Sequence, residues 1–238
     1  FKVNISPIGL TKNKKGVHLP FKDNYMLKPP QDDMQNIFAE YQEYGERKDI
    51  IFIPASIGTD KNQLEFIKLV NPDAIKKYEL VFAGPIRSKK YADSMLNVMH
   101  NRGIDGKILG HISKSQVAIL MKHSKIVALT TDPRPYQPYD PSPRVIHEAV
   151  RAGTPFFVSD LVIFPDAFKN FGRTYRHQDE FSLNKSFLDF TKLDLQKVSK
   201  ESFIFGEKKL TMNYVCKLTY DKIIENYNNF LENGDNFV

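Results

Sequence analysis

Residues 140–160 of the chain read D-P-S-P-R-V-I-H-E-A-V-R-A-G-T-P-F-F-V-S-D. The prolines at the beginning of this stretch predict a loop, and the amphipathic run over residues 144–152 predicts a helix. Gly153 and Pro155 are residue types that commonly end a helix, and the apolar residues after them predict a strand. This order of loop, helix, turn and strand is typical of one unit of an α/β fold.

Three charged residues fall at the start of this unit. Asp140 lies in the loop, and Arg144 and Glu148 are four residues apart, so they share one side of the predicted helix. His147 projects roughly 100° away from Glu148 around the helix, so both cannot face the same ligand. We favour Glu148 as the ligand-facing residue, because it shares a side of the helix with Arg144. A surface ion pair between Arg144 and Glu148, worth roughly a few tenths of a kcal/mol, is an equal alternative.

The same alternation of elements extends towards the N-terminus. Apolar runs predict strands at residues 50–53, 78–83, 108–109, 126–129 and 156–159. Amphipathic runs between them predict helices at residues 61–70, 88–101 and 113–122. Strands that are apolar throughout and alternate with helices indicate a parallel sheet with both faces buried. We therefore expect an α/β fold with a doubly wound, Rossmann-like parallel sheet.

We expect three parts: a linker or interdomain segment at residues 1–48, the α/β domain at residues 49–190, and a C-terminal helical extension at residues 191–238. A helix is predicted at Gln31–Tyr44 in the first part and at residues 210–231 in the last. Further expected elements are a strand at residues 1–8, a loop at 11–30, a short helix at 162–168, a helix at 178–190 and an ambiguous segment at 193–208.

The composition is ordinary for a soluble globular protein, with 41% apolar and 26% charged residues. The net charge of +6 suits a phosphate-bearing partner or an anionic membrane surface, although the charge is dispersed, which favours a simple solvated surface. Cys216 is the single cysteine, so we expect a reducing compartment. Without a leader or a long apolar run, the chain reads as cytoplasmic, with peripheral membrane contact left open, or as a fragment that begins within a longer protein.

Loops at the carboxyl ends of the predicted strands are candidate ligand sites, because parallel sheets bind ligands at that edge. Residues 55–62, A-S-I-G-T-D-K-N, combine a glycine turn with Lys61 and suit a phosphate, although an ordinary turn is an equal alternative. Arg87 and His111 follow the next two strands and read as turn or surface residues. The loop at residues 130–143 has five prolines and suggests ligand contact or a docking surface.

Four stretches carry a further pattern. They read I-I-F-I-P-A-S-I-G-T-D-K-N-Q-L-E-F-I from residue 50, Y-E-L-V-F-A-G-P from residue 78, K-I-L-G-H-I-S-K-S-Q-V-A-I-L-M-K-H-S-K-I-V-A-L-T from residue 107, and the stretch at residues 140–160. In this order they resemble the donor-binding C-terminal domain of the GT-B glycosyltransferases, in particular the large retaining family four. The resemblance covers about residues 49–175. Its most specific element is two acids with seven residues between them, followed by Ala-x-x-x-Gly-x-Pro.

The resemblance implies roles for individual residues. Glu148 would bind the ribose hydroxyls of a nucleotide sugar, and Asp140 takes the place of the acid, usually Glu, that faces the transferred sugar. Lys61 would contact the diphosphate, and the backbone at Ile112 would contact the base. The chemistry agrees, since a carboxylate accepts hydrogen bonds from paired hydroxyls and a lysine offsets the charge on a leaving phosphate.

The chain departs from the family pattern in two of these loops. Ser56 stands where the family commonly has an arginine that pairs with the lysine on the diphosphate. The family's glycine-rich turn is Pro141-Ser142-Pro143 here, and proline has no N–H group to donate. Arg144 is a candidate for the missing charge. Ser56, Ser142 and Arg144 therefore join the candidate donor-binding residues.

We thus predict a retaining glycosyltransferase with Asp140 as the catalytic candidate, a UDP-sugar or GDP-sugar as donor, and no cofactor or obligatory metal. The acceptor would be a glycan, lipid or protein, and we expect no nucleic-acid partner. Because a GT-B enzyme has two facing domains, the chain would be its C-terminal half, preceded by an N-terminal acceptor-binding domain. One alternative is a non-catalytic nucleotide-sugar-binding or docking module that kept the fold. A weaker one is a sugar-nucleotide epimerase, which the lack of a convincing His/Asp/Glu acid–base set disfavours.

Overall fold

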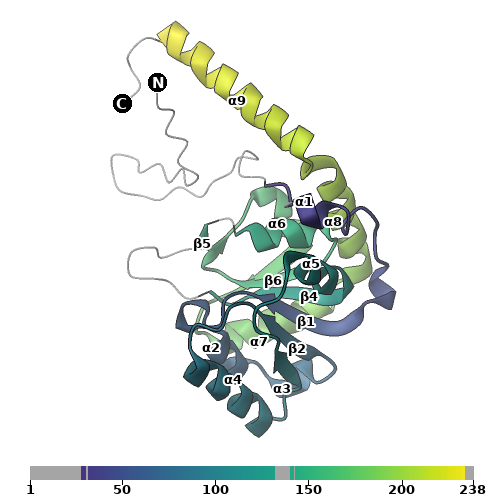
Figure 1. Ribbon diagram of the computed structural model, residues 1–238, viewed down its shortest axis with the longest axis vertical. Helices are drawn as coiled ribbons and strands as arrows, with labels where there is room; N and C mark the ends of the chain where they lie inside the picture. The colour runs from purple at the N-terminus through teal and green to yellow at the C-terminus, as the bar shows by residue number, and fades with distance from the viewer. Residues whose placement is uncertain (1–27, 31, 132–139, 142, 234–238) are drawn as a thin grey trace.

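A six-stranded parallel sheet forms the centre of the molecule (Figure 1). The computed structural model describes residues 28–30, 32–131, 140–141 and 143–233. In sheet order, the strands are β3 (Gly106–Ile108), β2 (Glu79–Ala83), β1 (Lys48–Pro54), β4 (Ser124–Leu129), β6 (Phe156–Ser159) and β8 (Gly172–Tyr175). A two-stranded parallel sheet joins β5 (Asp140–Pro141) to β7 (Val162–Ile163). The pairings of the larger sheet are all parallel, so the predicted doubly wound, Rossmann-like α/β fold is confirmed.

Helices cover both faces of the larger sheet (Figure 1). One face carries α2 (Gln63–Leu69), α3 (Pro72–Ile75), α4 (Lys89–Asn101) and α7 (Glu180–Thr191). The other carries α1 (Asp32–Gln35), α5 (Lys114–His123) and α6 (Arg144–Arg151), and α8 (Leu195–Lys209) packs against α6. Three 3-10 helices lie at Tyr44–Glu46 (η2), Thr59–Lys61 (η3) and Asp166–Phe171 (η4). The last helix, α9 (Met212–Asn233), extends away from the body of the domain (Figure 1).

Alternate residues of β1 supply the hydrophobic cores on the two sides of the sheet. Ile51 and Ile53 pack in the cluster that includes α2, α4 and α7. Ile50 and Phe52 pack in the cluster that includes α5 and α6. Each such buried side chain stabilises the fold by roughly 1.5–3 kcal/mol. Because both faces of the strand are buried from Ile50 onwards, its sequence is apolar from Ile50 to Pro54.

Local signals set the ends of several helices. Ser113 caps α5 in a capping box with Gln116, as its residue type favours. Gly153 follows α6 with a φ of 66°, in the left-handed region where a glycine is favoured. A Cβ atom at this position would also lie 2.8 Å from the carbonyl oxygen of Ser199 in α8. The predicted end of α6 is therefore confirmed, and it coincides with a close approach of two helices.

The segment before β1 differs from the prediction. The helix predicted at Gln31–Tyr44 is limited to the single turn α1, although Met34 and Phe38 are both buried. Their spacing of four residues is that of a helix face, yet Phe38 reaches the core from a turn that follows α1. The prediction was wrong because burial at helical spacing does not require a helix. The strand predicted at residues 1–8 and most of the loop predicted at 11–30 lie outside the described residues.

The region after β6 also differs. Residues 162–168, predicted as a short helix, form β7 and the beginning of η4, because the backbone at Val162 pairs with β5. The ambiguous segment at residues 193–208 is largely the helix α8. The strand β8 was not predicted. In the described part of the chain, none of the helices is both long and apolar enough to span a membrane.

The approach to β1 is fixed by the buried side chain of Arg47, which is 4% exposed. Its Nη1 donates to Thr154 Oγ1 at 2.7 Å, and its Nη2 donates to the carbonyl oxygens of Ala152 and Gln42 at 3.1 and 3.0 Å. Burial lowers the pKa of Arg47 to about 10, which leaves the guanidinium charged at neutral pH. One side chain thus ties the segment before β1 to the turn between α6 and β6.

Replacing Arg47 with methionine should lower the free energy of unfolding by roughly 2–4 kcal/mol, because Thr154 and Ala152 would stay buried without their donor. Urea unfolding followed by circular dichroism measures the change. Lys48→Met, at the adjacent exposed position, is the matched control and should stay within about 0.5 kcal/mol of the parent. An equally small effect of Arg47→Met would contradict this role.

Candidate functional site

The loops after β1 and β4 begin side by side at the carboxyl edge of the sheet. These two strands are neighbours where the strand order reverses, in the order β3-β2-β1-β4-β6-β8. The helices after them cover opposite faces, α2 after β1 and α6 after β4. Open α/β sheets bind their ligands at such a point. The candidate site is therefore formed by residues 55–62, by Thr130, Thr131 and Asp140, and by the start of α6.

The side chain of Gln63, which is completely buried, supports the loop at residues 55–62. Its Nε2 donates to the carbonyl oxygen of Ser56 at 2.8 Å, and its Oε1 accepts from the backbone N–H of Gly58 at 3.5 Å. On the other side, Ile57 forms a parallel bridge with Ile86 of the next loop. The loop is thus held in place by the side chain of Gln63 and by its own backbone pairing with the next loop.

Gly84 allows the loops after β1, β2 and β3 to come together. A Cβ atom at this residue would lie 2.2 Å from the carbonyl oxygen of Ala55, and its φ of 155° is unfavourable for other residues. Its N–H donates to the carbonyl oxygen of Gly110 at 2.8 Å. Gly110 precedes Ile112, whose side chain packs against the core on the α5 side. The backbone at Ile112, which is predicted to contact a base, is therefore linked through Gly84 to the loop at residues 55–62.

Lys61 and Asp140 meet at the centre of this edge. Lys61 Nζ lies 3.1 Å from Asp140 Oδ2, and the two side chains are 22% and 20% exposed. Thr131 Oγ1 donates to the same carboxylate oxygen at 3.1 Å, and Thr130 Oγ1 donates to the carbonyl oxygen of Lys61. A partly exposed ion pair contributes about 0–1 kcal/mol. An anionic ligand can therefore replace Asp140 as the partner of Lys61 at small cost.

Helix α6 buries Glu148 and His147 but leaves Arg144 exposed. Glu148 is 5% exposed, so an exposed surface ion pair does not describe it. His147 is buried, packs edge-on against Phe168 with ring centroids 5.0 Å apart, and has Nδ1 3.3 Å from the carbonyl oxygen of Pro143. Arg144 is exposed, and its Nη1 donates to the carbonyl oxygen of Pro29 at 3.0 Å.

The structure brings most of the predicted site residues to one edge of the sheet. Lys61 and Asp140 are in direct contact. Ser56 follows β1, Ile112 follows β3, and Arg144 and Glu148 lie in helix α6, which follows β4. Ser142 lies outside the described residues, as does most of the proline-rich loop.

Two residues at this edge, Gln63 and Thr131, were not singled out by the sequence patterns. Gln63 and Thr131 support the loop and the acid, yet neither belongs to a recognisable motif. Arg87 pairs with Asp60 of the loop at residues 55–62, and the distance from Nη1 to Oδ2 is 2.9 Å. His111 is exposed, as expected. Burial of a polar residue beside a glycine loop is the signal that identifies Gln63, and it requires the structure.

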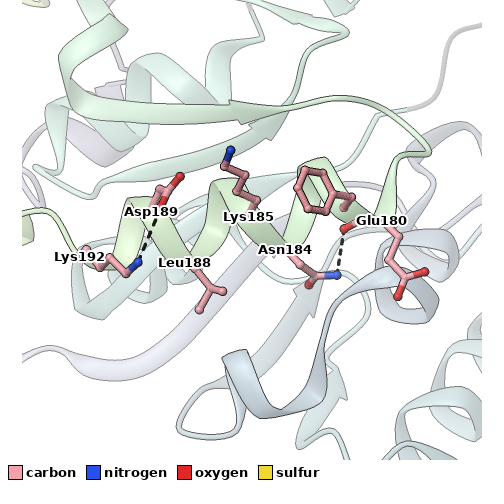
Figure 2. Close-up of a pocket in the computed structure, with 7 residues that line it drawn as sticks. Glu180, Asn184, Lys185, Leu188, Asp189 and Lys192 are labelled. Atoms are coloured by element: carbon pink, nitrogen blue, oxygen red, sulfur yellow. Dashed lines mark hydrogen bonds and ion pairs between the residues drawn. The ribbon is translucent and has the colours of Figure 1, made fainter.

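A surface hollow of about 690 Å³ lies elsewhere, along α7 (Figure 2). Its lining residues come from successive turns of this one helix and include Phe181, which is 75% exposed, and Leu188. Asn184 within it donates to the carbonyl oxygen of Leu69 at 2.9 Å and accepts from the N–H of Asn71 at 2.7 Å. Ligand sites are built from groups that converge from several elements, so we place the candidate site at the loop edge.

An open parallel sheet with a glycine loop, a lysine and an acid at its switch point is typical of nucleotide-binding α/β domains. The profile of the family described as glycosyl transferases group 1 matches residues 33–180, and the chain belongs to this family. The recognition of a GT-B glycosyltransferase from the sequence is thereby confirmed. Among curated protein sequences, none matches the chain significantly.

Solved structures of glycosyltransferases share this fold. Anabaena Alr3699/HepE in complex with UDP-glucose is similar with a TM-score of 0.58 and 14% identity, over 88% of this chain and 57% of that one. A glycosyltransferase from Rickettsia africae ESF-5 has a TM-score of 0.55 and 16% identity, over 78% and 48%. Sucrose-phosphate synthase from Thermosynechococcus elongatus has a TM-score of 0.55 and 14% identity, over 87% and 52%. The chain therefore spans about half the length of these structures.

Replacing Gln63 with leucine should loosen the loop at residues 55–62, because the carbonyl oxygen of Ser56 and the N–H of Gly58 lose their buried partner. Hydrogen exchange of the amides at residues 56–61 should quicken about tenfold, as expected for a local loss of about 1.4 kcal/mol. Gln116→Leu, which removes a glutamine hydrogen bond at the start of α5, is the matched control. Equal exchange in this loop for both variants would disprove the supporting role of Gln63.

Proposed function

We propose that this chain is the donor-binding part of a retaining glycosyltransferase, which transfers a sugar from a nucleoside-diphosphate sugar to a glycan, lipid or protein acceptor. The observation that carries the proposal is the contact of Lys61 with Asp140 at the switch point of the sheet, beside the helix that holds the buried Glu148. A cation, an acid and a second acid are thereby available to one ligand that spans the loops after β1, β3 and β4.

Each group has a definite task in this proposal. Glu148 accepts hydrogen bonds from the ribose hydroxyls, and its low exposure strengthens these charge-assisted bonds. The backbone at Ile112 lies against the base. Lys61 offsets the charge that develops on the leaving diphosphate when the glycosidic bond breaks. Asp140, held by Thr131, faces the transferred sugar.

The donor is proposed to be a UDP-sugar or GDP-sugar. Support for a UDP-sugar comes from the similar fold of Anabaena Alr3699/HepE, which was solved with UDP-glucose. No obligatory metal is proposed, because lysine and arginine side chains provide the positive charge. Since the chain spans about half the length of the similar structures, we propose that an acceptor-binding domain precedes it in the complete enzyme.

A non-catalytic nucleotide-sugar-binding module is the second candidate, and Ser56 is the observation that favours it. This residue removes a positive charge from the loop that would stabilise the leaving diphosphate, while Lys61 and Glu148 preserve groups for binding. Donor hydrolysis by the full-length protein separates the two candidates. Binding without hydrolysis or transfer would favour the module.

Replacing Glu148 with glutamine should weaken binding of the preferred nucleotide by about 10–100-fold, because a neutral amide replaces a carboxylate that accepts hydrogen bonds from the ribose. Glutamine keeps the volume of this buried side chain, so the fold should persist. Thermal shifts with UDP, GDP and ADP identify the nucleotide, and calorimetry then compares Glu148→Gln with Glu201→Gln, a control at an exposed position of α8. An unchanged affinity of Glu148→Gln would overturn the assignment.

Replacing Asp140 with asparagine should change binding and turnover in opposite directions. The variant should bind the nucleoside diphosphate about 2–5-fold more tightly, because Lys61 is freed from its ion pair. Sugar transfer should fall by about 100-fold or more, because the charge facing the sugar is lost. Calorimetry and a donor-turnover assay measure the two effects. Transfer at the parent rate would exclude Asp140 as the catalytic acid.

A further inference from the structure

The positive charge of the candidate diphosphate site comes from more than one segment. Ser56 contributes none, and Lys61 is already paired with Asp140 at 3.1 Å. The diphosphate of a nucleotide sugar carries one negative charge on each phosphate. Because the charges of Lys61 and Asp140 cancel in this ion pair, further cations beside it would favour binding of the two phosphates.

Residues 28–30, from the segment predicted as an interdomain linker, lie beside the start of α6. Arg144 Nη1 donates to the carbonyl oxygen of Pro29 at 3.0 Å. The next residue, Pro30, is buried, and its carbonyl oxygen accepts from Gln35 Nε2 at 3.4 Å. These two contacts anchor the backbone that follows Lys28, so this lysine is held near the candidate site.

The ammonium group of Lys28 is electrostatically coupled to two charged groups of the site. Its pKa lies below the ordinary value because of burial first and the Arg144 guanidinium second, whereas Asp140 acts in the opposite direction. A partly buried ammonium beside a second cation gains more from a bound anion than an isolated surface lysine does, because the anion also relieves the repulsion between the two cations.

We propose that Lys28 is a phosphate-binding residue which, with Lys61 and Arg144, surrounds the donor's diphosphate from three separate segments. This inference rests on the proposed function. Lys28 and Arg144 would add two positive charges beside the ion pair of Lys61 with Asp140. When the donor binds, Lys61 moves its hydrogen bond from Asp140 to a phosphate oxygen. Lys28 and Arg144 bind the phosphate oxygens on the α6 side.

This arrangement makes the contribution of Lys28 specific to the phosphates. A lysine that only covers the surface would affect all ligands little, whereas one that supports the fold would weaken a nucleoside and its diphosphate alike. A phosphate-binding lysine weakens the diphosphate alone. Arginine at the same position keeps the charge and the donors, so it should restore binding.

The test is calorimetric titration of the full-length protein with UDP and GDP, each compared with its nucleoside, uridine or guanosine. Lys28→Met should weaken binding of the nucleoside diphosphate by about tenfold or more, and leave nucleoside binding unchanged. Lys28→Arg should retain the parent affinity for the diphosphate within about threefold. Lys217→Met, at an exposed position of α9, is the control and should match the parent throughout.

An unchanged affinity of Lys28→Met for the diphosphate, or an equal loss for the diphosphate and the nucleoside, would overturn the role of Lys28 and leave the proposed function intact. Failure of Lys28→Arg to restore binding would overturn it in the same way. If the parent protein binds neither UDP nor GDP, the proposed function fails and the role of Lys28 fails with it.

Discussion

The parallel arrangement of the sheet is the constraint on which the rest of this structure depends. Parallel strands need crossover connections, and the crossover helices must cover the two faces of the sheet. All loops that follow a strand therefore begin at one edge. This is why Lys61, after β1, and Asp140, 79 positions further along the chain, meet at 3.1 Å. The candidate site is a direct consequence of how the strands are connected.

Helix α8 packs against α6, the helix that carries Glu148. A Cβ atom on Gly206 would lie 2.7 Å from the Cα atom of Arg151, so the backbones of α8 and α6 are in close approach. Arg151 also pairs with Glu207 of α8. Helix α6 is therefore buried along most of its length, and its first residue, Arg144, is exposed at the site. Packing at one end of α6 thus fixes where its other end presents charge.

Most of the fold could be predicted from the sequence, but only part of the site. Burial on both faces made β1 apolar from Ile50 to Pro54, and this pattern was sufficient to find it. Strand β8 was not predicted because it begins with Gly172, and a glycine in a sequence suggests a turn. In the structure, this glycine leaves room for the ring of Phe156, which a Cβ atom would approach to 2.2 Å. Gln63 acts through contacts that no periodicity encodes, and the proposed role of Lys28 depends on residues far away in the chain.

The positive side chains of the proposed diphosphate site affect which part of a nucleotide sugar the site would recognise. An arginine in the loop after β1 would bind phosphate oxygens in a fixed bidentate geometry, whereas a lysine is a point charge on a flexible stem. With serine at position 56 and lysines at positions 28 and 61, the proposed diphosphate site neutralises charge more than it fixes orientation. In the proposed site, orientation would depend on Glu148, which is buried, and on the backbone at Ile112, whose side chain packs against the core. Discrimination between donors is therefore expected to come from the nucleoside, because its binding groups are the rigid ones.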